Sequence, residues 1–133
     1  MNLRAIGRRV ALAGALALTV SALAVPAASA GEHERILTKG GAVWFDHSGE
    51  YIAALDLRKD GYSVRAYLDW DYRGAHYTED VTDNLGGRPG PVDPDRSVYR
   101  QISVPEHTTV TLTMCYSQGE YNRECSAGQR AEA

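Results

Sequence analysis

Long hydrophobic runs are scarce in this chain of 133 residues. Only residues 10–25 form an extended apolar stretch, and Gly14, Thr19 and Ser21 interrupt it. At about 16 residues, this stretch is shorter than the roughly 20 that a helix needs to span the hydrocarbon core of a bilayer. A membrane-embedded body is therefore not expected. The hydrophobic content of 44% and the charged content of 23% are those of a globular domain rather than a disordered chain.

The apolar stretch has the flanks of a secretory signal peptide. Arg4, Arg8 and Arg9 precede it, and a segment of small residues that includes Ala28 and Ala30 follows it. We expect residues 1–30 to be removed and the remainder to be released as an extracellular protein. An N-terminal membrane anchor is the alternative reading. Two export routes are compatible with this leader. One exports the chain unfolded, and the other is the twin-arginine route, which the pair Arg8-Arg9 would fit.

Basic residues are few in the part of the chain that would follow the leader. All 17 Asp and Glu residues lie after residue 30, whereas three of the 14 Lys and Arg residues lie before it. The expected mature chain therefore carries 11 basic against 17 acidic side chains, a net charge of −6. Nucleic acid phosphates and anionic membranes would repel such a chain. Neither is expected as a partner.

Cysteine is limited to Cys115 and Cys125, which stand ten positions apart on either side of a turn sequence around Glu120. In a hairpin centred on Glu120 the two would lie opposite each other, within the short reach of a disulfide. Closing a loop of this size contributes about 2 to 3 kcal/mol of stability. Two Cys without a nearby His do not make a zinc site, and a catalytic thiol is not expected in an oxidising medium. We therefore predict a disulfide.

A helical period is missing after the leader. From residue 42 onward apolar and polar residues alternate, and turn residues recur about every ten positions, as in short antiparallel strands. The clearest strand, at residues 62–71, sends one set of side chains inward: Tyr62, Val64, Ala66, Leu68 and Trp70. Residues 50–58 are expected to form another strand, in which the parity of Tyr51 with Ala53 and Leu55 indicates a core position for Tyr51. Glu79 and Asp80 mark residues 76–82 as an edge strand. Residues 83–96, rich in Gly and Pro, are expected to form a loop.

About seven such strands predict an all-β fold. We expect a single two-layer antiparallel β-sandwich of the immunoglobulin-like or fibronectin-like kind at residues 42–133, with one disulfide. A small barrel is the alternative architecture. Residues 31–41 are expected to be a flexible N-terminal segment. The expected form is a monomer.

Several stretches resemble a known group of proteins. They are the leader, the run Asp60-Gly61-Tyr62-Ser63-Val64-Arg65-Ala66, and the closing Val104-Pro105-Glu106, Val110-Thr111-Leu112, Cys115 and Cys125-Ser126. Together they are similar to small secreted proteins of actinomycetes, a loose set without assigned function. The resemblance covers most of the mature chain and implies secretion. It implies no activity and no functional residue.

One stretch of the sequence matches a calcium-binding loop in part. Asp69, Asp71, Gly74 and Asp80 occupy positions 1, 3, 6 and 12 of a calcium-loop template. However, Arg73 stands where an oxygen ligand belongs, and the flanks are strands whereas the template needs helices. An acidic hairpin tip is the simpler interpretation. No metal or other cofactor is expected.

Catalytic motifs are also missing. There is no Gly-x-Ser-x-Gly sequence, and the four His residues lie near turns or near the start of the mature chain. Pairs of carboxylates among Asp69, Asp71, Glu79 and Asp80 could serve sugar hydrolysis, but so small a domain rarely supplies a rigid cleft. An enzyme, in particular a small hydrolase, is therefore a remote alternative, and no catalytic residue is predicted.

Aromatic residues are the remaining functional signal. Tyr67 stands beside Arg65, Asp69 and Asp71 on the outward side of its strand, and Tyr72 and Tyr77 flank the next turn. We call these six residues the Tyr67 face. Tyr and Arg are enriched where proteins bind partners, although aromatic pairs on a sheet surface can also serve stability alone.

These patterns favour a secreted, non-catalytic binding module. Its partner would be an extracellular protein or polysaccharide, bound through the Tyr67 face or through the loop at residues 83–96. The alternative is a secreted inhibitor of an extracellular hydrolase, a protease or an amylase, that presents this loop to the active site. A stiff exposed loop loses little entropy on docking, which favours tight inhibition.

Overall fold

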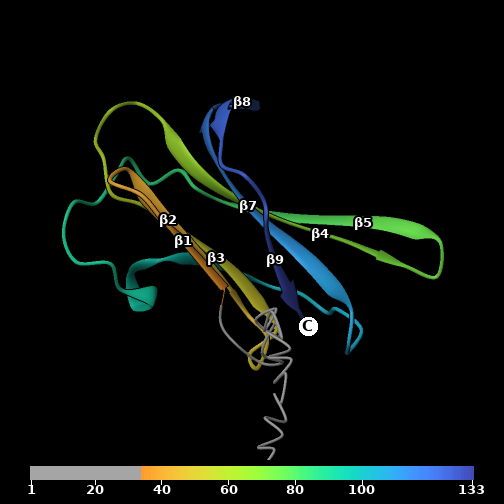
Figure 1. Ribbon diagram of the computed structural model, residues 1–133. Coiled ribbons are helices and arrows are strands. Elements are labelled where there is room, and N and C mark those ends of the chain that lie inside the picture. The colour runs from red at the N-terminus through yellow and green to blue at the C-terminus, as the bar shows by residue number, and fades with distance from the viewer. Residues whose placement is uncertain (1–33) are drawn as a thin grey trace, which may run out of the picture.

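The computed structural model describes residues 34–133 (Figure 1). The leader, its cleavage site and residues 31–33 lie outside the described residues. Within residues 34–133, no helix is long and apolar enough to cross a membrane.

Nine strands and one short 3₁₀ turn make up the described chain. They are β1 (Glu34–Leu37), β2 (Gly41–Asp46), β3 (Tyr51–Asp56), β4 (Ser63–Tyr72), β5 (Ala75–Asp83), η1 (Pro94–Arg96), β6 (Val98–Gln101), β7 (Thr109–Gln118), β8 (Tyr121–Cys125) and β9 (Gln129–Glu132). The prediction of an all-β fold is confirmed. The strands number nine rather than about seven, because β1 was not expected and the last predicted strand is divided into β8 and β9.

The strands form two antiparallel sheets that pack as a sandwich (Figure 1). Sheet A has the order β1-β2-β3-β6. Sheet B has the order β5-β4-β7-β8, and β9 pairs with β7 beyond the end of β8. The predicted edge strand is β5, and the predicted loop at residues 83–96 contains only the turn η1.

The main core lies between the sheets. Val64, Ala66, Leu68 and Trp70 of β4 are buried there, as their alternation predicted. The prediction was wrong for Tyr62, which is 39% exposed because it precedes the first residue of β4. They meet Phe45 of β2 and apolar residues from most other strands. Ordinary burial of such side chains contributes roughly 1.5 to 3 kcal/mol each, much of it offset by chain entropy.

Strand β3 is buried on both faces, and its alternation alone does not show which face is inside. Ile52 and Ala54 belong to the main core. Ala53 and Leu55 form a second cluster on the outer face of sheet A, against which Val92 of the long loop packs. Tyr51 therefore points outward, whereas its parity with Ala53 and Leu55 indicated a core position.

The segment expected to be flexible is tied to the sandwich along residues 34–41. Strand β1 pairs with β2 in full register. The Thr38 and Tyr116 hydroxyls lie 2.6 Å apart. Gly40 packs so tightly on Tyr116 that an added Cβ would lie 2.5 Å from the tyrosine hydroxyl oxygen. The ordered domain thus includes β1, because its residues bury Ile36 in the core.

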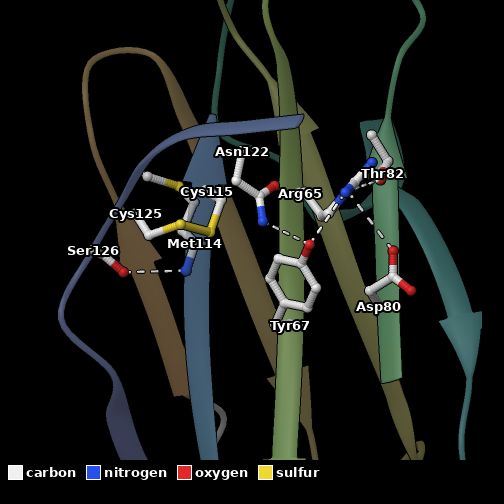
Figure 2. Close-up of a disulfide and its surroundings, with 9 residues drawn as sticks. All are labelled: Arg65, Tyr67, Asp80, Thr82, Met114, Cys115, Asn122, Cys125 and Ser126. Carbon is white, nitrogen blue, oxygen red and sulfur yellow. Dashed lines mark hydrogen bonds and ion pairs between the residues drawn. A yellow bond between two sulfur atoms is a disulfide. The ribbon is translucent and has the colours of Figure 1, made fainter. Parts of the chain in front are cut away.

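The predicted disulfide is confirmed. Cys115 and Cys125 stand directly opposite each other on β7 and β8, with their Cα atoms 4.0 Å apart. Just past the disulfide, the Met114 amide donates a 3.1 Å hydrogen bond to the Ser126 hydroxyl (Figure 2). These contacts hold the end of β8 against β7 where the chain leaves for β9.

Candidate functional site

Four residues of the predicted Tyr67 face do share one surface. Arg65, Tyr67, Asp69 and Asp71 alternate along the outer side of β4, opposite the buried set. Tyr67 is half-buried at the centre of this surface (Figure 2). The Arg65 and Asn122 side chains donate hydrogen bonds of 3.1 and 2.8 Å to its hydroxyl.

The polar groups around Tyr67 are largely used within the protein. Arg65 also donates a 2.8 Å hydrogen bond to the Thr82 hydroxyl and lies 3.8 Å from an Asp80 carboxylate oxygen (Figure 2). Its guanidinium carbon is 5.9 Å from the centre of the Tyr67 ring. This network links β4, β5 and β8, so its first effect is to stabilise the outer surface of sheet B.

The other two residues of the predicted face lie on the opposite side of the sheet. Tyr77 pairs directly with Trp70, and their rings stack with centroids 5.5 Å apart and an interplanar angle of 11°. Directly opposed residues of antiparallel strands share a face, so Tyr77 lies with Trp70 on the inner side. Tyr72 has the parity of Trp70 and packs against the core. Tyr77 therefore lies away from the surface around Tyr67, whereas Tyr72 lines a depression at the end of β4 together with Asp69 and Asp71.

A polar depression of about 600 Å³ adjoins Asp69 and Asp71. His76 Nδ1 lies 2.8 Å from Asp71 Oδ1, and the Thr78 hydroxyl donates a 2.6 Å hydrogen bond to Asp69. The hydrogen bond to Asp71 raises the pKa of His76 above its usual 6.5. Within the described residues, no group of three or more His, Cys, Asp or Glu side chains is placed to hold a metal ion.

Aromatic side chains gather on the outer face of sheet A, which sequence reasoning did not single out. Direct pairing across the four strands places Arg35, Trp44, Ala53 and Tyr99 in one row. Tyr51 lies in the adjacent row, beside Asp46. The small Ala53 separates the two larger rings of its row and is fully buried in the second cluster, against which Val92 packs.

Two depressions meet on this face. One has a volume of about 590 Å³ and the other about 480 Å³, and Tyr51 and Pro94 line both. We call their joint lining the sheet A groove. It consists of Trp44, Phe45, Tyr51, Pro94 and Tyr99, with the polar residues Glu34, Arg35, Asp46, Asp95 and Ser97. Glu34 and Phe45 pair directly and have the inward parity of the core, so the first depression reaches around the end of the sheet. Volumes of this size are typical of small-molecule and ligand sites.

The rings of the groove are held in place but are not all covered. Tyr51 and Tyr99 meet edge to face with centroids 6.0 Å apart. Tyr99 is 66% exposed, whereas Trp44 is buried, with 7% of its surface exposed. Burial and the nearby Asp46 raise the pKa of Tyr51, which keeps its hydroxyl protonated.

One signal in the sequence could have located part of the groove. The short turn after Asp46 indicates that β2 and β3 form a hairpin. The register of that hairpin decides whether the Trp44 and Tyr51 side chains lie on the same face of the sheet. The observed register puts both on the outer face. The contribution of Tyr99 could not be found in this way, because β6 is separated from β3 by more than 40 residues.

The long loop between β5 and β6 is held in shape by Arg96. Its guanidinium donates hydrogen bonds to the carbonyl oxygens of Arg88, Pro89 and Pro91, at 2.6, 3.2 and 2.5 Å. Asp93 caps the turn η1 by accepting a 3.0 Å hydrogen bond from the Asp95 amide. These hydrogen bonds fix the path of the loop between Arg88 and Arg96.

The chain matches no protein-family model, no curated protein and no solved structure.

Proposed function

We propose that this protein is an extracellular, non-catalytic binding module that takes its ligand in the sheet A groove. The observation that carries the proposal is the gathering of Trp44, Tyr51 and Tyr99 on one sheet face beside two depressions. Tyr and Trp offer large contact area together with a hydrogen-bonding tip, and they dominate binding hot spots. The disulfide and the secretory leader support the extracellular setting.

The groove is a better site than the surface around Tyr67 because its side chains have spare capacity. Tyr67 already accepts two hydrogen bonds from within the protein. The Tyr99 side chain, in contrast, contacts the Tyr51 ring and makes no side-chain hydrogen bond within residues 34–133. A ligand at Tyr99 would gain contacts without breaking existing ones, and the ring is already positioned, which lowers the entropic cost of binding.

An alanine substitution at Tyr99 tests the proposal. Purified wild-type protein and the variants Tyr99→Ala and Tyr121→Ala are compared for binding to a panel of insoluble polysaccharides and immobilised extracellular proteins. Tyr121 is the matched control, because it is 76% exposed on β8 in the other sheet. We expect Tyr99→Ala to lower the affinity for the ligand roughly tenfold or more, and Tyr121→Ala to leave the affinity unchanged. Equal binding by all three proteins would reject the groove as the site.

A second candidate function is inhibition of an extracellular hydrolase. The hydrogen bonds from Arg96 to the backbone of the long loop favour it. Three carbonyl contacts hold the segment from Arg88 to Pro91 in one shape. If this segment docks into a protease or an amylase, Arg96→Ala should raise the inhibition constant severalfold, while Arg123→Ala on β8 should not. Failure of the wild-type protein to inhibit any enzyme in a panel of proteases and amylases would reject this candidate.

The same proposal includes two finer points. The sandwich is of the immunoglobulin-like or fibronectin-like kind, whose loops and sheet faces serve recognition in many proteins. The protein acts as a monomer, which sedimentation measurements across a range of concentrations would test.

A further inference from the structure

We infer that the sheet A groove binds an arginine side chain of an extracellular partner protein, with the guanidinium against the Tyr99 ring and beside the Asp95 carboxylate. This inference rests on the proposed function and names the chemistry of its partner. Two features of the groove around Tyr99 carry it. Its side chains are of the same kinds as those that hold an arginine elsewhere in this protein, and their charge is negative.

The outer surface of sheet B shows which groups hold an arginine in this protein. The guanidinium of Arg65 lies over the Tyr67 ring, with its carbon 5.9 Å from the ring centre (Figure 2). It also lies 3.8 Å from an Asp80 carboxylate oxygen and donates a 2.8 Å hydrogen bond to the Thr82 hydroxyl. An aromatic ring, a carboxylate and a hydroxyl together thus satisfy the flat face and the N–H groups of this cation.

The second depression of the groove brings together the same three kinds of group without an arginine among its lining residues. Tyr51, Pro94, Asp95, Ser97 and Tyr99 line this space of about 480 Å³. Tyr99 supplies a ring that is largely exposed. The Asp95 carboxylate has no hydrogen bond or ion pair within residues 34–133. The Ser97 hydroxyl donates a 2.6 Å hydrogen bond to the Pro94 carbonyl oxygen, which leaves its own oxygen able to accept one.

The charge around this depression favours a cation. Burial, Asp46 and, less strongly, Asp95 raise the pKa of Tyr51, so both carboxylates exert a negative potential at its hydroxyl. Arg96, the neighbour of Asp95 in sequence, donates instead to carbonyl oxygens of the long loop. Arg35 lines the other depression. Since the expected mature chain is also acidic as a whole, a basic partner surface would be attracted to it.

Among organic cations, a guanidinium fits this depression best. It is planar and weakly hydrated, so it can stack on one ring face, and its alkyl stem can lie along the apolar ring of Pro94. The ammonium of lysine is a compact, strongly hydrated charge and gains less from such a surface. A quaternary ammonium ion is bound in cages of several aromatic rings. This depression is lined by two rings, Tyr51 and Tyr99, which meet edge to face.

Titrations followed by NMR test the inference. The probes are Nα-acetylarginine amide, Nα-acetyllysine amide and Nα-acetylcitrulline amide, of which the last has the shape of the arginine compound without its charge. We expect the arginine compound to cause saturable shifts of the Tyr99 ring and Ser97 amide signals. Binding of the lysine compound should be about threefold weaker or more, and that of the citrulline compound about tenfold weaker or more. Added sodium chloride should weaken the binding of the arginine compound.

Four substitutions assign the contacts. Tyr99→Leu keeps an apolar side chain without the ring, and Asp95→Asn removes the charge with little change of shape. Each should lower the affinity for the arginine compound roughly threefold or more. Tyr99→Phe keeps the ring and should lower it less than about twofold. Glu120→Gln makes the same change of charge in the exposed turn between β7 and β8 and should have no effect.

The outcomes separate this inference from the proposed function. The inference is overturned if the lysine or citrulline compound binds as tightly as the arginine compound. It is also overturned if Tyr99→Leu or Asp95→Asn binds the arginine compound as tightly as the wild type does. Absence of arginine binding overturns it too. In each of these cases the groove remains the binding site if a ligand from the panel of polysaccharides and extracellular proteins depends on Tyr99, and the proposed function is rejected as well if none does.

Discussion

The backbone amide of Asp56 donates a 2.9 Å hydrogen bond to the carboxylate of Asp83, which follows it by 27 residues. Both side chains are buried. Arg88 lies 2.8 Å from the same carboxylate oxygen, and its own amide donates to the Asp56 carbonyl. The ends of β3 and β5 and the start of the long loop are therefore joined by one buried polar cluster, which also sets where the loop begins its path over sheet A.

Removing Asp83 should destabilise the fold. In Asp83→Ala the Asp56 amide loses its acceptor and Arg88 loses its charged partner. We therefore expect the free energy of unfolding to fall by about 2 to 3 kcal/mol. Urea denaturation of the two proteins measures the difference. Glu120→Ala, in the exposed turn between β7 and β8, should change stability by less than about 0.5 kcal/mol. A loss at Asp83 no larger than this control would contradict the structural role of the cluster.

The carboxyl of Asp56 should make the stability depend on pH. Burial, the largest influence, raises the pKa of Asp56 above its ordinary 3.8, and one of its oxygens has no hydrogen-bond partner. The folded protein therefore holds this proton more tightly than the unfolded chain. The resulting stabilisation is complete below pH 3.8 and is lost as the pH rises through the folded-state pKa.

Asp56→Asn isolates this effect. An amide cannot ionise, but its oxygen can still accept the 3.0 Å hydrogen bond from the Arg58 amide. The free energy of unfolding of the wild type, minus that of Asp56→Asn, should fall between acidic and neutral pH. Urea denaturation at several pH values gives this difference. A difference that stays constant, or rises, would show that the fold does not raise the pKa of the Asp56 carboxyl.

Loss of the disulfide should cost about 2 to 3 kcal/mol, the value expected for so short a loop. The double variant Cys115→Ala/Cys125→Ala removes it without leaving a free thiol. Reduction of the wild type should lower its stability by a similar amount, and the same reductant should not affect the double variant. A double variant as stable as the oxidised wild type would mean that the contacts of Ser126 hold β8 by themselves.

His76 should titrate above its ordinary pKa of 6.5, because its hydrogen bond to Asp71 favours the protonated ring. Histidine resonances followed by NMR across pH give the value directly. Asp71→Asn should lower the pKa of His76 toward 6.5, whereas Asp95→Asn, in the turn η1, should not. Since His76 is exposed, we expect little change in the stability of the fold. An unchanged His76 titration in Asp71→Asn would mean that the 2.8 Å contact does not persist in solution.

Sequence reasoning succeeded where the signal was local. The alternation in β4 placed Val64, Ala66 and Leu68 inside and Arg65 and Tyr67 outside, because successive side chains of a strand must point to opposite faces. It failed in β3, where both faces are apolar and Tyr51 was placed on the wrong side. It also failed for Tyr72 and Tyr77, because nearness to a turn was used instead of strand parity, and parity puts both on the Trp70 side.

What the sequence by itself determined is therefore the strand character of the chain, the inner and outer sides of its clearest strand, and the opposition of Cys115 and Cys125. Only the tertiary structure decided that Tyr99 lies beside Tyr51 and that the long loop brings Pro94 into the lining of both depressions. The reason is physical. Side-chain parity is a property of each strand, whereas the register between strands far apart in the chain depends on how both sheets bury their apolar faces together.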